Sequence, residues 1–101
     1  MVKHIILWKL KEEFTAEEKQ QIKEGIKEGL EGLQGKIEGL SDVKVITEGL
    51  DSSTADVMLD STFESYEALK AYKVNPAHVE VANTKVRPNV QVRLTYDFEE
   101  N

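Results

Sequence analysis

The sequence predicts an α+β domain in which four strands and two helical regions follow one another in the order β-α-β-β-α-β. Three observations lead to this fold class: a β-branched and aromatic segment at residues 2–11, apolar residues at helical spacing over residues 22–37, and apolar–polar alternation over residues 90–98. The chain has 101 residues, a common length for one hydrophobic core and too short for two. We therefore expect residues 1–101 to form a single domain.

Residues 2–11 predict the first strand, which has two largely apolar faces. One face carries His4, Ile6, Trp8 and Leu10, and the other carries Ile5 and Leu7. Such a strand needs cover on both faces, and this requirement is typical of a central strand.

The first helix is expected to begin near Thr15, because Thr15 and Glu18 have the spacing of a capping box. Its inward stripe follows spacings of three and four residues: Ile22, Ile26, Leu30, Leu33 and Ile37. Four glycines lie beside this stripe, although each interior glycine costs up to about 1 kcal/mol relative to alanine: Gly25, Gly29, Gly32 and Gly35. The simpler interpretation is close backbone packing, or fraying after Leu33; the alternative is room for a ligand between helix and sheet.

Two further strands are predicted at residues 42–50 and 55–63. In the second of these, one face carries Val57, Leu59 and Phe63, and the other carries Met58. Ser65 is expected to cap a short helix that carries Tyr66, Leu69 and Tyr72. Asn75 and Pro76 are a good cap and a good first helical residue, so a new helix should begin there, with Val79, Ala82 and Val86 directed inward. It should end before Pro88.

The last strand alternates strictly, which is typical of a strand with one solvent-exposed polar face. Its apolar side chains are Val90, Val92, Leu94, Tyr96 and Phe98, and its polar side chains are Gln91, Arg93, Thr95 and Asp97.

This element order matches the ferredoxin-like split βαβ arrangement, with a four-stranded antiparallel sheet and helices on one face. The first and third strands are then central. Helices cannot cover both faces of the sheet, so the face with Ile5, Leu7 and Met58 needs a partner. The simplest partner is the same face of a second copy related by two-fold symmetry, and a small domain gains stability from such pairing. We therefore expect a homodimer.

Composition excludes several classes of function. The formal net charge of −6 and the scattered Lys and Arg residues argue against nucleic-acid binding. The chain has no cysteine and two histidines, which excludes thiolate sites and gives little support for a metal site. No glycine-rich phosphate loop follows a strand, so we expect no nucleotide and no cofactor. No apolar run is long enough for a membrane or secretory segment, and we expect a cytoplasmic location.

Four groups of residues together resemble a known family over nearly the whole chain. They are residues 2–9, Thr62 to Ser65, Tyr72 with Asn75-Pro76-Ala77-His78, and Tyr96-Asp97. In these positions the chain is similar to the stress-responsive dimeric α/β-barrel (Dabb) domains. The resemblance implies a ferredoxin-like monomer whose sheet packs on that of a second copy to close a barrel.

The family's members include plant proteins linked to stress and a plant polyketide cyclase that closes a ring by aldol chemistry. For this chain the resemblance implies His78 as a general base, paired with Tyr72, and His4 as a pocket residue. A further pocket histidine of the cyclase, on the third strand, aligns with Val57.

The residues themselves allow this chemistry. His78 would be the third residue of its helix, where the positive end of the helix dipole disfavours imidazolium and keeps a neutral, basic ring. Tyr72 could donate its phenolic O–H to a developing oxyanion. The simpler interpretations are that His78 packs or hydrogen-bonds at a helix start, and that Tyr72 is a core residue with a solvated tip.

Three hypotheses follow from these residues. The first is a homodimeric domain that binds a small, largely apolar ligand between sheet and helices, in a pocket lined by His4, Trp8, Tyr72 and His78. The second is a polyketide-cyclase-like lyase with His78 as general base and Tyr72 as oxyanion stabiliser. The third is a structural dimer without a ligand.

Overall fold

The computed structural model describes residues 1–101. Its elements are β1 (Val2–Leu10), α1 (Ala16–Glu31), β2 (Leu40–Ile46), β3 (Val57–Phe63), α2 (Tyr66–Val74), α3 (Pro76–Val81) and β4 (Val90–Glu99). A π-helical turn, η1 (Ala82–Val86), and a 3₁₀ turn, η2 (Arg87–Asn89), join α3 to β4. The four strands form one antiparallel sheet in the order β2-β3-β1-β4. The predicted ferredoxin-like fold is therefore confirmed.

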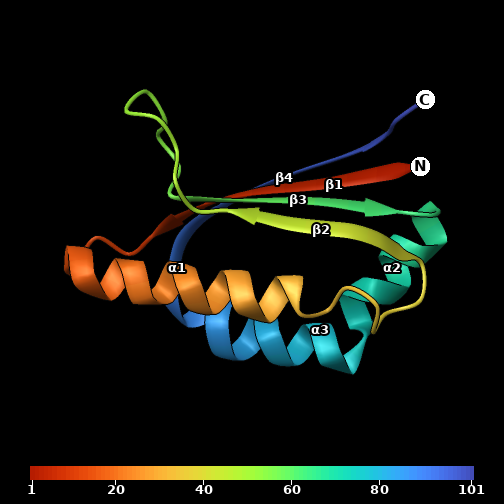
Figure 1. Ribbon diagram of the computed structural model, residues 1–101, viewed down its shortest axis with the longest axis horizontal. Coiled ribbons are helices and arrows are strands. Elements are labelled where there is room, and N and C mark those ends of the chain that lie inside the picture. The colour runs from red at the N-terminus through yellow and green to blue at the C-terminus, as the bar shows by residue number, and fades with distance from the viewer.

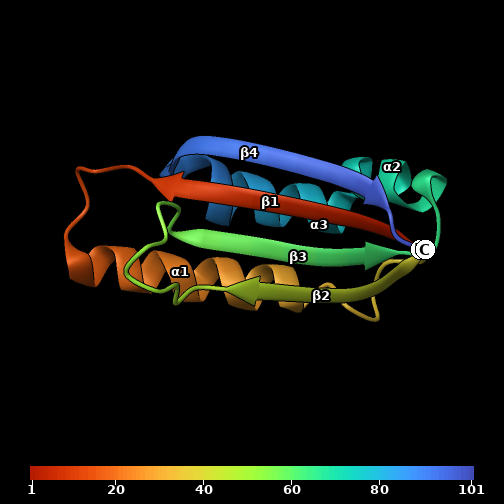
Figure 2. The ribbon, with the colours of Figure 1, turned by 90° about the horizontal axis from the view of Figure 1, so that it is seen from above.

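The helices lie on one face of the sheet and leave the other face bare (Figure 1). Seen from above, β4 and β1 lie over α3, whereas β3 and β2 lie toward α1 (Figure 2). The two central strands are β1 and β3, as the sequence predicts.

The second and third strands are shorter than predicted. Pairing between them runs from Leu40 opposite Phe63 to Ile46 opposite Met58, so residues 47–56 have no strand partner. Asp56 lies at the end of this connection, where its carboxylate accepts a hydrogen bond from the Leu10 amide at 2.8 Å. This contact joins the start of β3 to the end of β1.

Helix α1 begins as predicted, because both hydrogen bonds of the capping box between Thr15 and Glu18 are present. The predicted stripe faces the sheet, with Ile26, Leu30, Leu33 and Ile37 buried and Ile22 partly buried. A Cβ atom at Gly29 would lie 2.8 Å from Cγ1 of Val81 in α3. This close approach supports the packing interpretation of the glycine row at Gly29.

The two short helices also begin at their predicted caps. The Ser65 hydroxyl accepts from the Ala68 amide at 3.1 Å, and the Asn75 side chain accepts from the Ala77 amide at 2.9 Å. Leu69 and Tyr72 are fully buried, but Tyr66 is 53% exposed. Helical geometry explains the difference, since six residues rotate Tyr66 by roughly 120° from Tyr72 around the axis.

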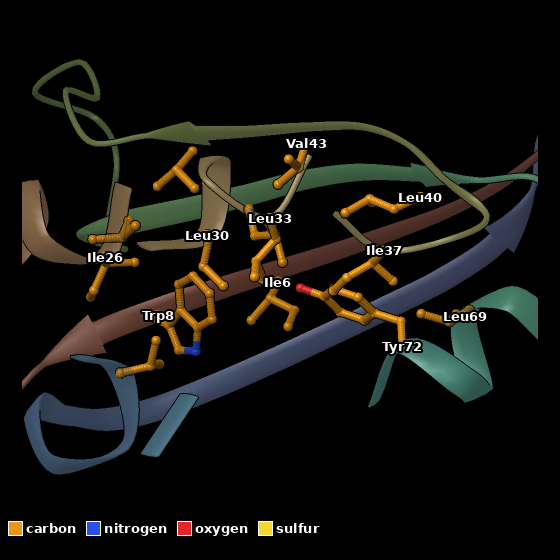
Figure 3. Packing of buried hydrophobic residues seen from close by; sticks show 14 of the residues in the cluster. Ile6, Trp8, Ile26, Leu30, Leu33, Ile37, Leu40, Val43, Leu69 and Tyr72 are labelled. Carbon is orange, nitrogen blue, oxygen red and sulfur yellow. The ribbon is translucent and has the colours of Figure 1, made fainter. Parts of the chain in front are cut away.

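The inner face of β1 is buried as predicted, and it forms the centre of the core with residues from α1 and α2 (Figure 3). The outer face is continuous across the sheet, because Tyr96 pairs with Ile5, Leu94 with Leu7, and Leu7 with Met58. We call this the outer sheet face; its apolar residues are Ile5, Leu7, Ile46, Met58, Val92, Leu94, Tyr96 and Phe98.

Strand β4 differs from expectation in the direction of its two faces. From Val92 onward its apolar side chains lie on the outer sheet face, where Leu94 is 62% and Tyr96 is 71% exposed, whereas Val90 packs against the core. Its polar side chains point to the helix side, where Arg93 and Asp97 take part in the site described below. The polar face of this strand therefore serves the interior space between sheet and helices.

No helix in the chain combines the length and the apolar character needed to cross a bilayer. The cytoplasmic location expected from the sequence stays a prediction.

Candidate functional site

A cavity of about 250 Å³ lies between the sheet and the segment from α3 to β4. Seven of its 13 lining residues are hydrophobic, and the polar ones come mainly from β4 and the helix ends. The lining residues are His4, Ile6, Trp8, Leu30, Leu59, Lys73, His78, Ala82, Val86, Arg87, Val90, Gln91 and Arg93. An apolar floor with a few converging polar groups is typical of a small-molecule site.

Three of the four predicted ligand residues, His4, Trp8 and His78, line this cavity. His4 and Trp8 reach it because alternate residues of β1 point toward the helices. His78 reaches it from the first turn of α3, which Asn75 caps.

His4 makes a hydrogen bond with Asp97 that the sequence did not predict. The antiparallel register places the two residues opposite each other, with Nδ1 of His4 2.5 Å from Oδ1 of Asp97. Only 3% of the His4 side chain is exposed, and its burial lowers the pKa of the imidazole, whereas the adjacent carboxylate acts in the opposite direction. A neutral ring beside a carboxylate must carry its proton on Nδ1, so Nε2 is left as an acceptor.

Asp97 also contacts a cation. Nζ of Lys73, near the end of α2, lies 3.7 Å from Oδ2 of Asp97. The carboxylate therefore has one oxygen near a buried imidazole and the other near a half-exposed ammonium group. This arrangement fixes the His4 ring in place.

The ring of His78 stacks on that of Tyr72, with centroids 4.1 Å apart and planes inclined at 35°. Burial lowers the pKa of His78, and the positive charges of Arg87 and Arg93 act in the same direction. The Lys73 carbonyl opposes this shift, although no hydrogen bond of good geometry reaches the buried Nδ1 atom. The neutral ring predicted for His78 thus follows mainly from burial.

Tyr72 lies behind His78 and does not line the cavity. Its side chain is 1% exposed and packs against Phe63, with ring centroids 4.9 Å apart. Its hydroxyl points from α2 toward Ile6 and has no hydrogen-bond partner in the protein (Figure 3). Burial raises the pKa of Tyr72, so the phenol is a neutral donor.

Trp8 belongs to the floor of the cavity and is 3% exposed. Its indole Nε1–H is buried and has no acceptor in the protein.

Sequence reasoning did not single out the cations around the cavity: Lys73, Arg87 and Arg93. Arg93 belongs to the polar face of β4, which the alternation alone assigned to solvent. The predicted topology could have indicated them, because β4 is an edge strand of a sheet with helices on one face only. One of its two faces must therefore point toward the helices.

The chain has no group of three His, Asp or Glu side chains arranged to hold a metal ion. The polar groups in and beside the cavity are two imidazoles, three cations, an indole N–H and a buried phenol.

Comparison with known proteins gives a consistent result. The family model of the Stress responsive A/B Barrel Domain (Dabb) matches residues 2–100. None of the curated proteins matches the chain in sequence.

Solved structures share the fold over nearly the full length of the chain. A dimeric protein of unknown function with a ferredoxin-like fold, from Bacteroides fragilis, is 29% identical with a TM-score of 0.91, covering 98% of this chain and 95% of that one. A protein from Arabidopsis thaliana is 25% identical with a TM-score of 0.75, covering 100% and 96%. A Dabb family protein from Mesorhizobium loti is 17% identical with a TM-score of 0.74, covering 99% and 96%.

Proposed function

Since the chain belongs to the Dabb family of stress-responsive A/B barrel domains, we propose that it works as a homodimer that binds a small, largely apolar ligand between sheet and helices. The observation that carries the proposal is the cavity of about 250 Å³, whose lining is mainly hydrophobic. His4, Trp8 and His78 are proposed as direct ligand contacts. Tyr72 completes the proposed set as a neutral donor directly behind His78.

The homodimer is supported by the outer sheet face and by the relatives. Leu94 and Tyr96 are 62% and 71% exposed there, and an apolar surface of this extent is typical of an interaction site. Similar structures from Bacteroides fragilis and Thermobifida fusca are described as dimeric. Two-fold pairing of this face would bring like residues together and bury both copies.

Sedimentation velocity tests the dimer. We expect twice the monomer mass for the wild-type chain and monomer mass for Leu94→Lys, because pairing would bury lysine charges in an apolar contact. Val74→Lys is the matched control, since Val74 is 76% exposed on the helix side and should not affect the mass. A monomeric wild-type chain, or a dimer unaffected by Leu94→Lys, would refute pairing through this face.

An uncharged probe tests the cavity. The chain has one tryptophan, so a fluorescence change on addition of 3-phenylpropan-1-ol reports on Trp8 at the cavity floor. Ala82 lines the cavity, and Ala82→Phe should abolish the response by filling it. Ala71→Phe places the same side chain at an exposed position of α2 and should bind like wild type. Equal binding by wild type and Ala82→Phe would show that the alcohol binds elsewhere.

A second function is favoured by the stacked pair of Tyr72 and His78. In this alternative the protein is a polyketide-cyclase-like lyase: neutral His78 removes a proton beside a carbonyl, and the Tyr72 O–H stabilises the enolate. The assay is aldol ring closure of heptane-2,4,6-trione, in which C1 bonds to C6 and one water is lost. We expect closure to stop in His78→Ala and to slow in Tyr72→Phe; closure that persists in His78→Ala would exclude this mechanism.

A further inference from the structure

The charged side chains that line the cavity, Lys73, Arg87 and Arg93, are all positive. We propose that the ligand is a small carboxylate with an apolar body, whose anionic group lies among Lys73, Arg87 and Arg93. This inference rests on the ligand-binding function proposed above and names the class of ligand.

The charge at the cavity is positive, whereas the net charge of the chain is negative. Asp and Glu outnumber Lys and Arg by 19 to 13, and the net charge is −6. Yet no Asp or Glu lines the cavity, whereas both arginines of the chain do. A cationic cavity attracts small anions, while the net negative charge of the protein disfavours nonspecific binding of polyanions to the rest of its surface.

These cations are poorly neutralised by the protein. Arg93 makes no salt bridge and no side-chain hydrogen bond, and Arg87 donates only to the uncharged amide of Asn83, at 2.6 Å. Lys73 is 3.7 Å from Asp97, but that carboxylate already accepts the bond from His4. Two guanidinium groups therefore remain available for an external carboxylate, which they can bind through paired N–H groups.

Their charge reaches into the cavity. Arg87 and Arg93 both act to lower the pKa of His78, and Lys73 and Arg93 act in the same way on His4. His4 on β1 and His78 on α3 both line the cavity, so this positive potential acts on groups of the sheet and of the helix layer.

The floor favours a ligand with an apolar body. Ile6, Leu59 and Val86 are at least 94% buried and supply apolar contacts. Inorganic phosphate would match the cations but would leave this floor unused, and for that reason we infer a carboxylate carried on a hydrocarbon frame.

The test compares three probes by Trp8 fluorescence and calorimetry: 3-phenylpropanoate, 3-phenylpropan-1-ol and inorganic phosphate. The acid and the alcohol share one apolar body and differ in charge. We expect the acid to bind at least tenfold more tightly than the alcohol, and phosphate to bind more weakly than the acid. Arg93→Gln should weaken the acid tenfold or more and leave the alcohol unchanged, which also shows that the variant is folded. Lys36→Gln removes an exposed cation outside the cavity and should bind both like wild type.

The possible outcomes separate this inference from the function on which it depends. If acid and alcohol bind equally, or if Arg93→Gln affects both equally, the cavity binds apolar ligands but the carboxylate inference is wrong. If phosphate binds as tightly as the acid, the cations select phosphate and the inference is wrong. If neither organic probe changes Trp8 fluorescence, the binding function and the inference fail together.

Discussion

Replacing Asp97 by alanine would remove the only acceptor of the buried Nδ1–H of His4. A hydrogen bond to a charged group contributes about 1.5–3 kcal/mol, and removing one partner of a buried donor incurs its desolvation cost. The ion pair of Asp97 with Lys73 adds little, roughly 0–1 kcal/mol, because the lysine side chain is 44% exposed. We expect Asp97→Ala to lower the free energy of unfolding by about 2–3 kcal/mol.

The matched variant is Asp97→Asn, which keeps an acceptor oxygen at the same place and removes the charge. We expect it to lose less than about 1 kcal/mol, since the neutral bond persists. Urea unfolding followed by Trp8 fluorescence measures both; for a chain of this size, 2–3 kcal/mol corresponds to a midpoint shift of roughly 1–2 M. NMR titration should show the pKa of His4 lowered further in both variants, because the carboxylate that raises it is gone. If the two variants unfold alike, or if Asp97→Ala unfolds like wild type, the hydrogen bond does not stabilise the fold.

Two other predictions concern pH and backbone conformation. Burial lowers the pKa of His4 and His78 in the folded state, so the unfolded chain binds more protons below about pH 6.5. The contribution of these histidines to the free energy of unfolding should be fully present above pH 6.5 and should fall on acidification by less than about 1.4 kcal/mol per pH unit for each histidine. His78→Asn should make this fall less steep when stability is measured from pH 7.5 to 5.5. If the profiles of wild type and variant are parallel, the lowered pKa of His78 is contradicted. Gly35 and Gly39 both have φ of 85°, but a Cβ at Gly39 would lie 2.5 Å from Cβ of Ala68, whereas one at Gly35 meets nothing within 4 Å. We expect Gly35→Ala to lower the free energy of unfolding by about 1–2 kcal/mol through backbone strain, and Gly39→Ala to lower it by about 1–3 kcal/mol more through the contact with Ala68. Urea unfolding measures both losses. Equal losses would argue against the contact.

Local signals determined much of this protein. The capping box at Thr15 and the Asn75-Pro76 start depend on residues within one helical turn, and both are present as predicted. Alternation placed His4 and Trp8 on the inner face of the first strand, since successive strand residues must point to opposite faces. The element order and the apolar, uncovered sheet face could therefore be predicted from residues that are close together in the chain.

Which residues face the cavity depends on the pairing of the strands. Alternation shows that β4 has one polar and one apolar face, but not which of them looks toward the helices; that depends on the register with β1. The register brings Asp97 to His4 across 93 residues of sequence and places Arg93 beside the cavity. These contacts join residues that are far apart in the chain, and their partners are fixed only when the sheet forms. For this reason no local sequence pattern predicts the His4–Asp97 pair or the cations that line the cavity.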